Sequence, residues 1–318
     1  MILMIGAGPM AQEYAKVLNG LERDFVVVGR SEASAAKFQE ATGVSPFIGG
    51  LDKYCESEDL QPFEFGIVTT GVEQLAPTTI KLIDHGVKNI LVEKPAGLDA
   101  QEIAELADYA ASHDAKVYVA YNRRFFSSLL AAKDIIEQDG GVQSFNFELT
   151  EWGHVIAKLE KAEGVKENWF LANTTHVTDM AFHLGGFPEQ LSCFFSGGEA
   201  WHERSYNFSG AGVSDSGALF AYHGNWGAPG RWSVEVLTSA HRLIFRPMEK
   251  LQIQKLGSVA IEPVEVDDSL DAQYKPGLYK QTEAFLNADT SSLCSLDDQK
   301  KHIELYSRMA GYTSSGYL

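Results

Sequence analysis

The first 120 residues alternate between short apolar runs and stretches in which apolar residues recur at helical spacing. The apolar runs lie at residues 3–5, 25–28, 65–69, 89–92 and 117–120. Between the first two runs, Met10, Tyr14 and Val17 follow one another at intervals of three or four positions, as on one face of a helix. Buried strands separated by amphipathic helices predict a parallel sheet that helices cover on both faces, which is a doubly wound α/β domain.

Helix start signals support this alternation. Ser31 can cap a helix that runs to about residue 41, and Pro77 falls in the first turn of a helix predicted at 75–85. Asp99 with Glu102 makes a capping-box-like start for a helix that ends near residue 112. Each helix therefore begins shortly after a predicted strand ends.

The pattern changes after about residue 125. Apolar and polar residues alternate at 145–149, 232–236 and 251–254, which predicts strands with one buried face. Helical spacing persists only at 129–138, 177–184, 279–286 and 296–310. We therefore expect two domains. Residues 1–121 form the doubly wound domain, and residues 122–318 form an α+β domain with a large, mostly antiparallel open sheet.

Composition narrows the class of protein. A chain of 318 residues suits two domains, and no run of 18 apolar residues predicts a membrane span. A net charge of -17 argues against nucleic acid or an anionic membrane as the main partner, because a polyanion would be repelled. The three cysteines are scattered and form no CxxC, so neither a disulfide framework nor a thiolate zinc site is expected. A cytoplasmic protein is the simplest interpretation.

A glycine-rich turn follows the first predicted strand. Residues 6–11 read Gly-Ala-Gly-Pro-Met-Ala and fit the G-x-G-x-x-G/A pattern of Rossmann domains. Gly6 permits the tight turn, Gly8 lets a pyrophosphate approach the backbone, and the small Ala11 permits close packing of helix on strand. The pyrophosphate would lie at a helix N-terminus, so we expect Gly6, Gly8, Pro9 and Met10 to bind a dinucleotide. The alternative is a purely structural turn.

The end of the second strand bears on which dinucleotide binds. An NAD-binding domain commonly has Asp or Glu at this position, to hold the ribose 2′-hydroxyl. Here residues 28–31 read Val-Gly-Arg-Ser, without a carboxylate. Arg30 and Ser31 can instead hold a 2′-phosphate, so we expect NADP to be preferred, with NAD as the alternative. The other interpretation is a solvated arginine beside a helix-capping serine.

Two further motifs carry a family resemblance. Residues 92–95 read Val-Glu-Lys-Pro at the end of a predicted strand, and residues 121–125 read Tyr-Asn-Arg-Arg-Phe after the last strand of the first domain. Residues 176–179 add a His-x-x-Asp pair in the second domain. Together with the glycine turn, these motifs resemble the glucose–fructose oxidoreductase / inositol dehydrogenase / MocA family, and the resemblance covers nearly the whole chain.

The resemblance implies hydride transfer between a nicotinamide and a hydroxyl-bearing carbon of a sugar, sugar derivative or cyclitol. By position, Lys94 would contact the reacting hydroxyl, in a Lys-Pro bond that is often cis in such proteins. Glu93 and Asn122 would lie near the nicotinamide ribose and ring. A lysine at a strand end of a parallel sheet is well placed to polarise an oxygen or relay a proton. The alternative is a surface lysine before a turn-forming proline.

The chain departs from the family after its fourth strand. Residues 69–71 read Thr-Thr-Gly where the family often has Thr-Pro-Asn followed by a histidine. The resemblance still implies that Thr69 and Thr70 bracket the nicotinamide side of the cofactor. One polar contact is lost with the histidine.

The second-domain motif departs from the family as well. The resemblance makes His176 the general acid/base, and an imidazole with a pKa near neutrality suits that role. Asp179, one helical turn on, would orient His176 or touch substrate. The family often has Asp four residues before this histidine, where this chain has Ala172. Asn173 is nearby but cannot act as a base. A capping or core histidine is the alternative.

The same helix carries a third residue that could bind a metal. His183 falls on the same helical face as His176 and Asp179. Three ligands from one helix make a poor tetrahedral set, so we expect no metal.

Four residues are candidates for binding the sugar-like substrate: Arg123, Trp169, Asn173 and His176. Most of the tryptophans in the second half are expected in the core or in an interface, and Trp169 is the one with a candidate ligand role. Redox-neutral use of bound NAD, as in an epimerase or glycosidase, and a non-catalytic dinucleotide-binding sensor remain alternative functions. An apolar second face of the large sheet, carrying Val, Phe and Trp, predicts a homodimer or homotetramer.

Overall fold

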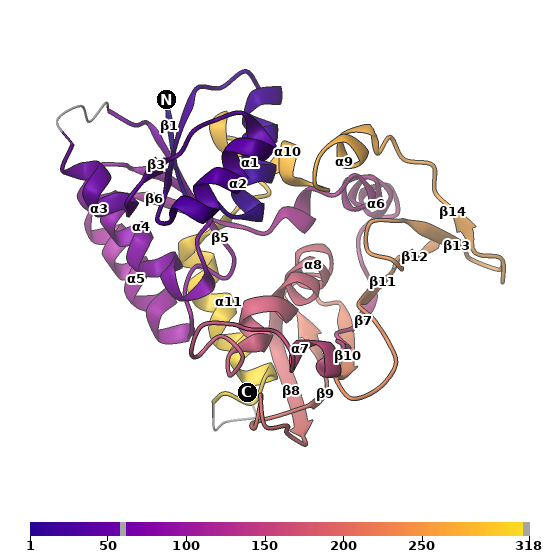
Figure 1. The fold of residues 1–318 in the computed structure, drawn as a ribbon. Coiled ribbons are helices and arrows are strands. Elements are labelled where there is room, and N and C mark those ends of the chain that lie inside the picture. Colours follow the sequence, from indigo (N-terminus) through magenta and orange to yellow (C-terminus); the bar gives the residue numbers. More distant parts are fainter. Residues whose placement is uncertain (58–61, 314–318) are drawn as a thin grey trace. The chain divides into compact units, whose positions relative to one another are not determined.

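The computed structural model describes residues 1–57 and 62–313 (Figure 1). These residues form two compact units. The first unit joins Met1–Asn122 with Asp271–Ile303, and the second joins Arg123–Leu270 with the residues from Glu304 onward. The chain first passes from one unit to the other between Asn122 and Arg123, next to the predicted domain boundary at residue 121. The segment Asp271–Ile303, which the sequence-based division assigns to the second domain, packs instead with the first.

The first unit contains a seven-stranded sheet with the order β15-β6-β5-β4-β1-β2-β3. Its strands are β1 (Ile2–Ile5), β2 (Phe25–Gly29), β3 (Phe47–Ile48), β4 (Phe65–Val68), β5 (Asn89–Glu93), β6 (Lys116–Ala120) and β15 (Cys294–Ser295). All neighbours pair in parallel except β15, which is antiparallel to β6. The parallel, doubly wound sheet predicted from the apolar runs is confirmed.

Five helices lie at predicted places: α1 (Pro9–Gly20), α2 (Glu32–Thr42), α4 (Leu75–Asp84), α5 (Ala100–Ser112) and α10 (Leu278–Leu286). The sequence analysis did not predict α3 (Gly50–Cys55), the 3-10 turn η1 (Val72–Gln74) or α9 (Ser269–Gln273), which begins at the end of the second unit and runs into the first. The predicted caps form. Ser31 accepts a hydrogen bond from the Ser34 amide at 3.3 Å, and Asp99 accepts one from the Glu102 amide at 2.9 Å. Local polar spacing therefore sets where these helices begin.

Helix α10 belongs to the first unit because its apolar face meets the central sheet. The Phe285 ring lies 5.4 Å from the Phe65 ring of β4 and 6.2 Å from the Tyr118 ring of β6, edge to face in both cases. Leu278 is fully buried on the same helix. Helical spacing predicts α10 from sequence, but the spacing does not say which core its apolar face joins.

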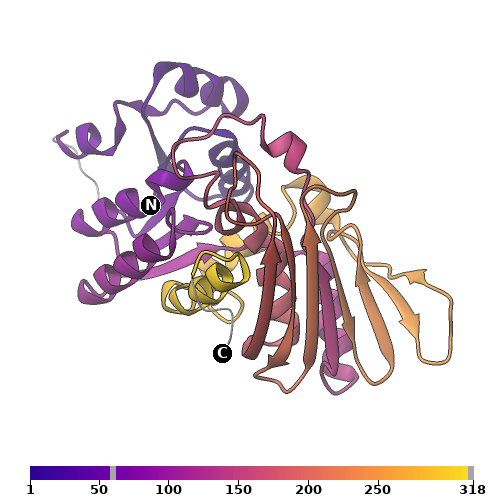
Figure 2. The same ribbon diagram turned by 90° about the horizontal axis from the view of Figure 1, so that it is seen from below.

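The second unit contains an eight-stranded sheet with the order β14-β13-β12-β11-β7-β10-β9-β8 (Figure 2). The strands are β7 (Ser144–Glu148), β8 (Pro188–Ser196), β9 (Asn207–Ser214), β10 (Leu219–Asn225), β11 (Ser233–Leu237), β12 (His241–Phe245), β13 (Gln252–Lys255) and β14 (Glu262–Pro263). Only the pairing of β7 with β10 is parallel. The prediction of a large, mostly antiparallel sheet is confirmed.

The remaining helical segments lie wholly or partly in the second unit. They are η2 (Asn122–Phe125), α6 (Ser127–Gln138), α7 (Gly153–Ile156), the π-helical turn η3 (Phe170–Thr174), α8 (Thr175–Gly185) and α11 (Leu296–Met309), whose last turns fall in this unit. Helix α8 packs on β7 and β11 through buried aromatic residues. The Phe182 ring of α8 lies 6.1 Å from the Phe145 ring and 5.4 Å from the Phe147 ring. These rings form the core between helix and sheet.

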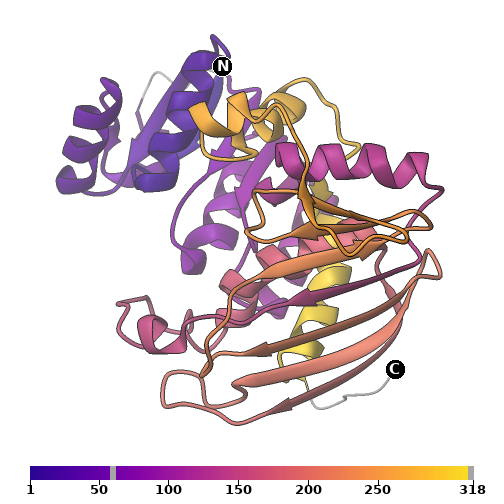
Figure 3. The ribbon, with the colours of Figure 1, turned by 90° about the vertical axis from the view of Figure 1, so that its right-hand side faces the viewer.

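The opposite face of this sheet is open and can be followed in Figure 3. Its exposed positions on β7–β10 are mostly small or polar, with two large apolar side chains: Asn146, Ser192, Phe194, Ser209, Ala211, Leu219, Ala221 and His223. The expectation that Val, Phe and Trp dominate this face is wrong, because the large apolar residues of these strands point toward α8. Along residues 1–57 and 62–313, no helix is both long and apolar enough to cross a membrane.

Candidate functional site

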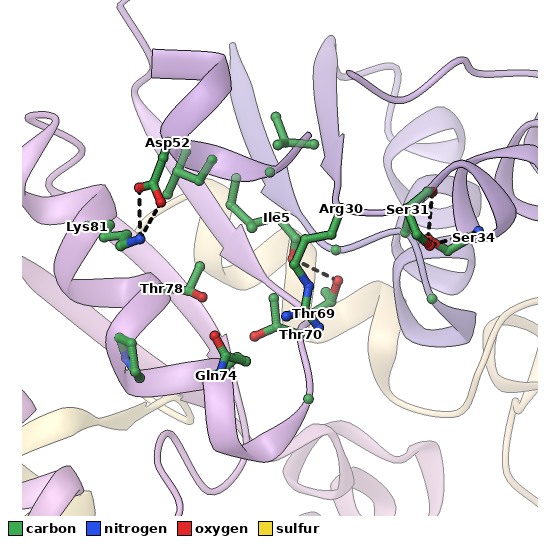
Figure 4. A pocket seen from close by; sticks show the side chains of 18 of the residues that line it. Ile5, Arg30, Ser31, Ser34, Asp52, Thr69, Thr70, Gln74, Thr78 and Lys81 are labelled. Carbon is green, nitrogen blue, oxygen red and sulfur yellow. Dashed lines mark hydrogen bonds and ion pairs between the residues drawn. The ribbon is translucent and has the colours of Figure 1, made fainter. Parts of the chain in front are cut away.

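A cavity of about 800 Å³ opens at the carboxyl ends of β1, β2 and β4 in the first unit (Figure 4). Its walls come from the glycine turn, the start of α2, the start of α3 and the face of α4. Ligands of open α/β sheets bind outside the carboxyl ends of the strands, where helices begin. The cavity therefore lies where the glycine turn predicts a dinucleotide.

The glycine turn has the geometry that a pyrophosphate requires. Gly6 has φ +120°, and a Cβ there would lie 2.4 Å from the Thr69 hydroxyl oxygen. A Cβ on Gly8 would meet nothing within 4 Å, so this glycine leaves its backbone open to a ligand. Gly8 also caps α1 without any side-chain hydrogen bond, and Pro9 occupies the first helical turn. Both glycines and the uncapped helix start fit a bound anion.

The end of β2 presents Arg30 and Ser31 to the same cavity. Arg30 is exposed, and Figure 4 shows its side chain reaching into the cavity. Ser31 caps α2, and its hydroxyl lies 2.7 Å from that of Ser34. On another wall, Lys81 of α4 pairs with Asp52 of α3 at 2.7 Å. Among the described residues that line the cavity, Asp52 carries the carboxylate, and this carboxylate already forms an ion pair with Lys81.

Thr69 and Thr70 both line the cavity at the end of β4. The Thr69 amide and hydroxyl both donate to the Ile5 carbonyl, at 2.8 and 3.1 Å. These bonds tie the end of β4 to the glycine turn. Thr69 and Thr70 therefore share the cavity wall with the glycine turn, and their contact with a cofactor stays a prediction.

The Glu-Lys-Pro motif forms a turn at the end of β5. Glu93 accepts a hydrogen bond from the buried Tyr14 hydroxyl at 3.1 Å. Burial raises the pKa of Glu93, and the Lys94 ammonium and the Tyr14 hydroxyl oppose part of the rise. Burial and the Glu93 charge raise the pKa of Tyr14, which keeps its hydroxyl a donor. The Lys94–Pro95 peptide bond is cis, as the resemblance implies.

Asn122 is buried in the turn that follows β6, within the Tyr-Asn-Arg-Arg-Phe motif. Its side-chain nitrogen donates to the Pro276 carbonyl at 2.9 Å. Pro276 belongs to Asp271–Ile303, the segment that joins the first unit from the far end of the sequence. The segment thus holds a residue that sequence analysis assigns to the cofactor site.

In the second unit, Asp179 is fully buried on α8 and pairs with Arg124. The Arg124 guanidinium donates to both carboxylate oxygens, at 2.8 and 2.6 Å. This bidentate pair differs from the expectation that Asp179 orients His176 directly or touches substrate. The carboxylate is engaged by an arginine from the Tyr-Asn-Arg-Arg-Phe motif, which sequence analysis left without a role.

His176 and Arg123 meet around one tryptophan. The Trp232 ring lies 6.1 Å from the His176 ring, and the Arg123 guanidinium stacks over it at 5.3 Å. Arg231 stacks over the same ring at 4.6 Å and over Trp152 at 5.4 Å. Two predicted residues, Arg123 and His176, therefore lie against the same tryptophan ring.

Glu151 organises the other two predicted substrate residues. This buried carboxylate accepts hydrogen bonds from the Trp169 indole at 2.9 Å, from the Asn173 amide at 2.7 Å and from the Thr174 hydroxyl. Burial raises the pKa of Glu151, and the three donors oppose the rise. Trp169 and Asn173 thus turn their polar groups toward Glu151 and not toward solvent.

Sequence analysis missed Glu151. Its only local signal is an acidic residue directly after a strand, in the Thr-Glu-Trp at 150–152. The three donors lie 18 to 23 residues further along the chain. They come from the stretch that contains the π-helical turn η3, and π turns occur often at functional sites.

These features define a class of protein. A doubly wound domain with an open glycine turn, paired with a sheet-rich second unit, is a dinucleotide-binding oxidoreductase architecture. Residues 1–121 match a family model described as oxidoreductase family, NAD-binding Rossmann fold. Over these residues the chain is similar to the NAD-binding domain of the glucose–fructose oxidoreductase / inositol dehydrogenase / MocA family.

Similar proteins agree with this assignment. Trans-1,2-dihydrobenzene-1,2-diol dehydrogenase of Mus musculus is 23% identical over 163 residues, which are 50% of this chain and 47% of the mouse protein. The match therefore spans about half the length of that relative. A levoglucosan dehydrogenase in complex with NADH and levoglucosan has a TM-score of 0.77 at 17% identity, covering 98% of this chain and 96% of its own.

A second solved structure shows the same fold. UDP-N-acetylglucosamine 3-dehydrogenase from Acidithiobacillus ferrooxidans has a TM-score of 0.72 at 14% identity, covering 97% of this chain and 95% of its own. At such identities the likeness concerns the fold.

Proposed function

We propose that this protein is an NAD(P)-dependent dehydrogenase or reductase that acts on a CH–OH group of a sugar, sugar derivative or cyclitol. One observation carries the proposal. Lys94 directly follows β5, which lies two strands from β1 and its glycine turn in the order β5-β4-β1, so a bound nicotinamide and the lysine would lie at the same carboxyl-terminal side of the sheet. The names of the similar proteins, each a dehydrogenase of a hydroxyl-bearing compound, support the substrate class.

When bound, the nicotinamide supplies or accepts the hydride. Lys94 polarises the substrate oxygen and exchanges a proton with it, and its ammonium interacts with the neighbouring Glu93 carboxyl, whose pKa it lowers. His176 is the second acid/base group. Asp179 is a positioning residue, because its carboxylate holds Arg124 and thereby the motif that follows β6.

The experiment is a cofactor and substrate screen. Thermal shift with NAD, NADP and their reduced forms identifies the bound dinucleotide. Sugars, sugar acids and cyclitols are then assayed for a change in reduced nicotinamide absorbance. Turnover that releases a changed cofactor supports the proposal. Substrate conversion without net cofactor change would show redox-neutral use of the nicotinamide, and dinucleotide binding without any conversion across the panel would favour a sensor.

We further propose that the protein prefers NADP(H). Arg30 and Ser31 provide a guanidinium and a hydroxyl at the end of β2, and Asp52 is already paired with Lys81. Arg30→Ala is expected to weaken NADPH binding by about 10-fold or more, the scale of one charge-assisted hydrogen bond, and to leave NADH binding nearly unchanged. Fluorescence titration measures both affinities. Tighter NADH than NADPH binding in the unaltered protein would contradict the preference.

Assembly is a separate proposal. The open face of β7–β10 presents small side chains with Phe194 and Leu219, a surface that a second copy can cover about a two-fold axis. We expect a homodimer or a dimer of dimers in light scattering after size exclusion. Ala221→Arg, which places a bulky charge in this face, is expected to shift the protein toward the monomer. A monomer of about 34.9 kDa in the unaltered protein would rule the interface out.

A further inference from the structure

Gln299 of α11 joins the two strand-end turns of the first unit. Its side chain is 0% exposed. The side-chain nitrogen donates to the Pro95 carbonyl at 3.0 Å and to the Tyr121 hydroxyl at 3.0 Å. The first acceptor belongs to the residue that directly follows Lys94, and the second to the residue that directly follows β6. One buried amide thus links the ends of β5 and β6.

A second glutamine supports the same region. Gln281 of α10 is 0% exposed. In the amide orientation that satisfies both partners, its side-chain oxygen accepts from the backbone amides of Tyr121 and Asn122, at 3.1 Å each. Sequence positions far beyond the Rossmann strands therefore hold both turns, and neither glutamine stands out in the sequence.

The turn at Lys94 depends on such external support. The Ala96 amide donates to the Glu93 carbonyl at 3.0 Å, which closes the turn, and Ala96 has φ +84°. Pro95 itself has no amide hydrogen to donate. Its carbonyl is therefore held from outside, by the Gln299 amide, and a buried carbonyl must find a donor. Both hydrogens of that amide are used, so a side chain of similar size with fewer than two donors leaves at least one of the two acceptors without its bond.

We propose that Gln299 is a positioning residue for Lys94, holding the turn so that the ammonium group stays in register with the nicotinamide. The inference rests on the proposed function insofar as Lys94 acts on substrate. The hydrogen bonds from Gln299 to Pro95 and Tyr121 are independent of the proposed function, because they are structural features of the first unit alone. Displacement of a catalytic group by about 1 Å lowers turnover on the order of 10²-fold.

Three variants test the proposal. Gln299→Leu keeps the volume and removes both donors. Gln299→Glu removes both donors when ionised and restores one when protonated, and burial favours the protonated form. Thr282→Val is the matched control, because Thr282 is a fully buried polar residue of α10 whose hydroxyl donates to the Leu278 carbonyl of the same helix.

Turnover is the first measurement. Gln299→Leu is expected to lower kcat by about 10- to 100-fold, with dinucleotide Kd within a few fold of the unaltered protein. Gln299→Glu is expected to recover activity relative to the unaltered protein as the pH falls, because protonation returns a donor. Thr282→Val is expected to retain kcat. A loss of stability alone would move neither the pH profile nor the split between kcat and Kd.

The second measurement needs no turnover. Competitive acetylation read by mass spectrometry reports the reactivity of each lysine as a function of pH. Gln299→Leu is expected to change the labelling profile of Lys94 but not that of Lys88, and Thr282→Val to change neither. An unchanged Lys94 profile in folded Gln299→Leu would overturn the inference. If the unaltered protein shows no turnover but the Lys94 profile depends on Gln299, the proposed function fails and the positioning role stands.

Discussion

Lys94→Ala is expected to lower kcat by at least about 10²-fold while dinucleotide affinity stays within a few fold, because the lysine acts at the reacting hydroxyl. Its ammonium also opposes the burial that raises the pKa of Glu93, so the variant makes protonation of Glu93 easier. Steady-state kinetics with the substrate found by screening gives kcat, and fluorescence titration gives the dinucleotide Kd.

Lys88→Ala is the matched control for this prediction. Lys88 is an exposed lysine that directly precedes β5, at the opposite end of the strand from Lys94, and its ammonium donates to the His113 carbonyl at 2.6 Å. Its loss is expected to leave kcat unchanged. Near-normal turnover of a folded Lys94→Ala protein on its real substrate would refute the role of Lys94 and with it the central part of the proposed function.

Arg124→Leu is expected to destabilise the protein by about 3–5 kcal/mol, the usual cost of leaving a buried charge without its partner. Asp179 is 0% exposed, and both of its carboxylate oxygens accept from Arg124. Urea unfolding measures the effect as a lower midpoint. Because the pair also holds the motif after β6, any remaining folded fraction is expected to turn over slowly.

The double variant Arg124→Leu with Asp179→Leu separates the cost of an orphaned charge from that of lost packing. It is expected to recover most of the stability, since no unpaired charge remains. Lys250→Ala provides a second control, because its ion pair with Asp268 lies on the surface of the same unit and should leave the urea midpoint nearly unchanged. A double variant as unstable as the single one would mean that the pair is not the source of the effect.

The hydrogen bonds of Asp179 and Glu151 in the second unit limit what these two carboxylates can do in the proposed reaction. Asp179 and Glu151 are both buried carboxylates, yet neither offers a free oxygen to a substrate: one is bonded by Arg124, the other by Trp169, Asn173 and Thr174. Under the proposed function we therefore expect His176 to be the acid/base group in this unit, and the two carboxylates to act by positioning the residues they bond.

Much of the fold was encoded locally. The strands of the first unit follow from apolar runs, and α2 and α5 begin at Ser31 and Asp99 because those side chains bond amides three residues on. The places of the glycine turn and of Lys94 were predictable for the same reason, since each directly follows a strand that its own apolar run predicts.

Only the tertiary structure decided which distant residues complete these sites. Gln299 reaches Pro95 across 204 positions, and Asp179 reaches Arg124 across 55. Helical spacing in α10 and α11 shows an apolar face without naming the core that it joins, so the place of Asp271–Ile303 in the first unit was not readable. Periodicity records the burial of each residue, whereas the partner of a buried polar group depends on the path of the whole chain.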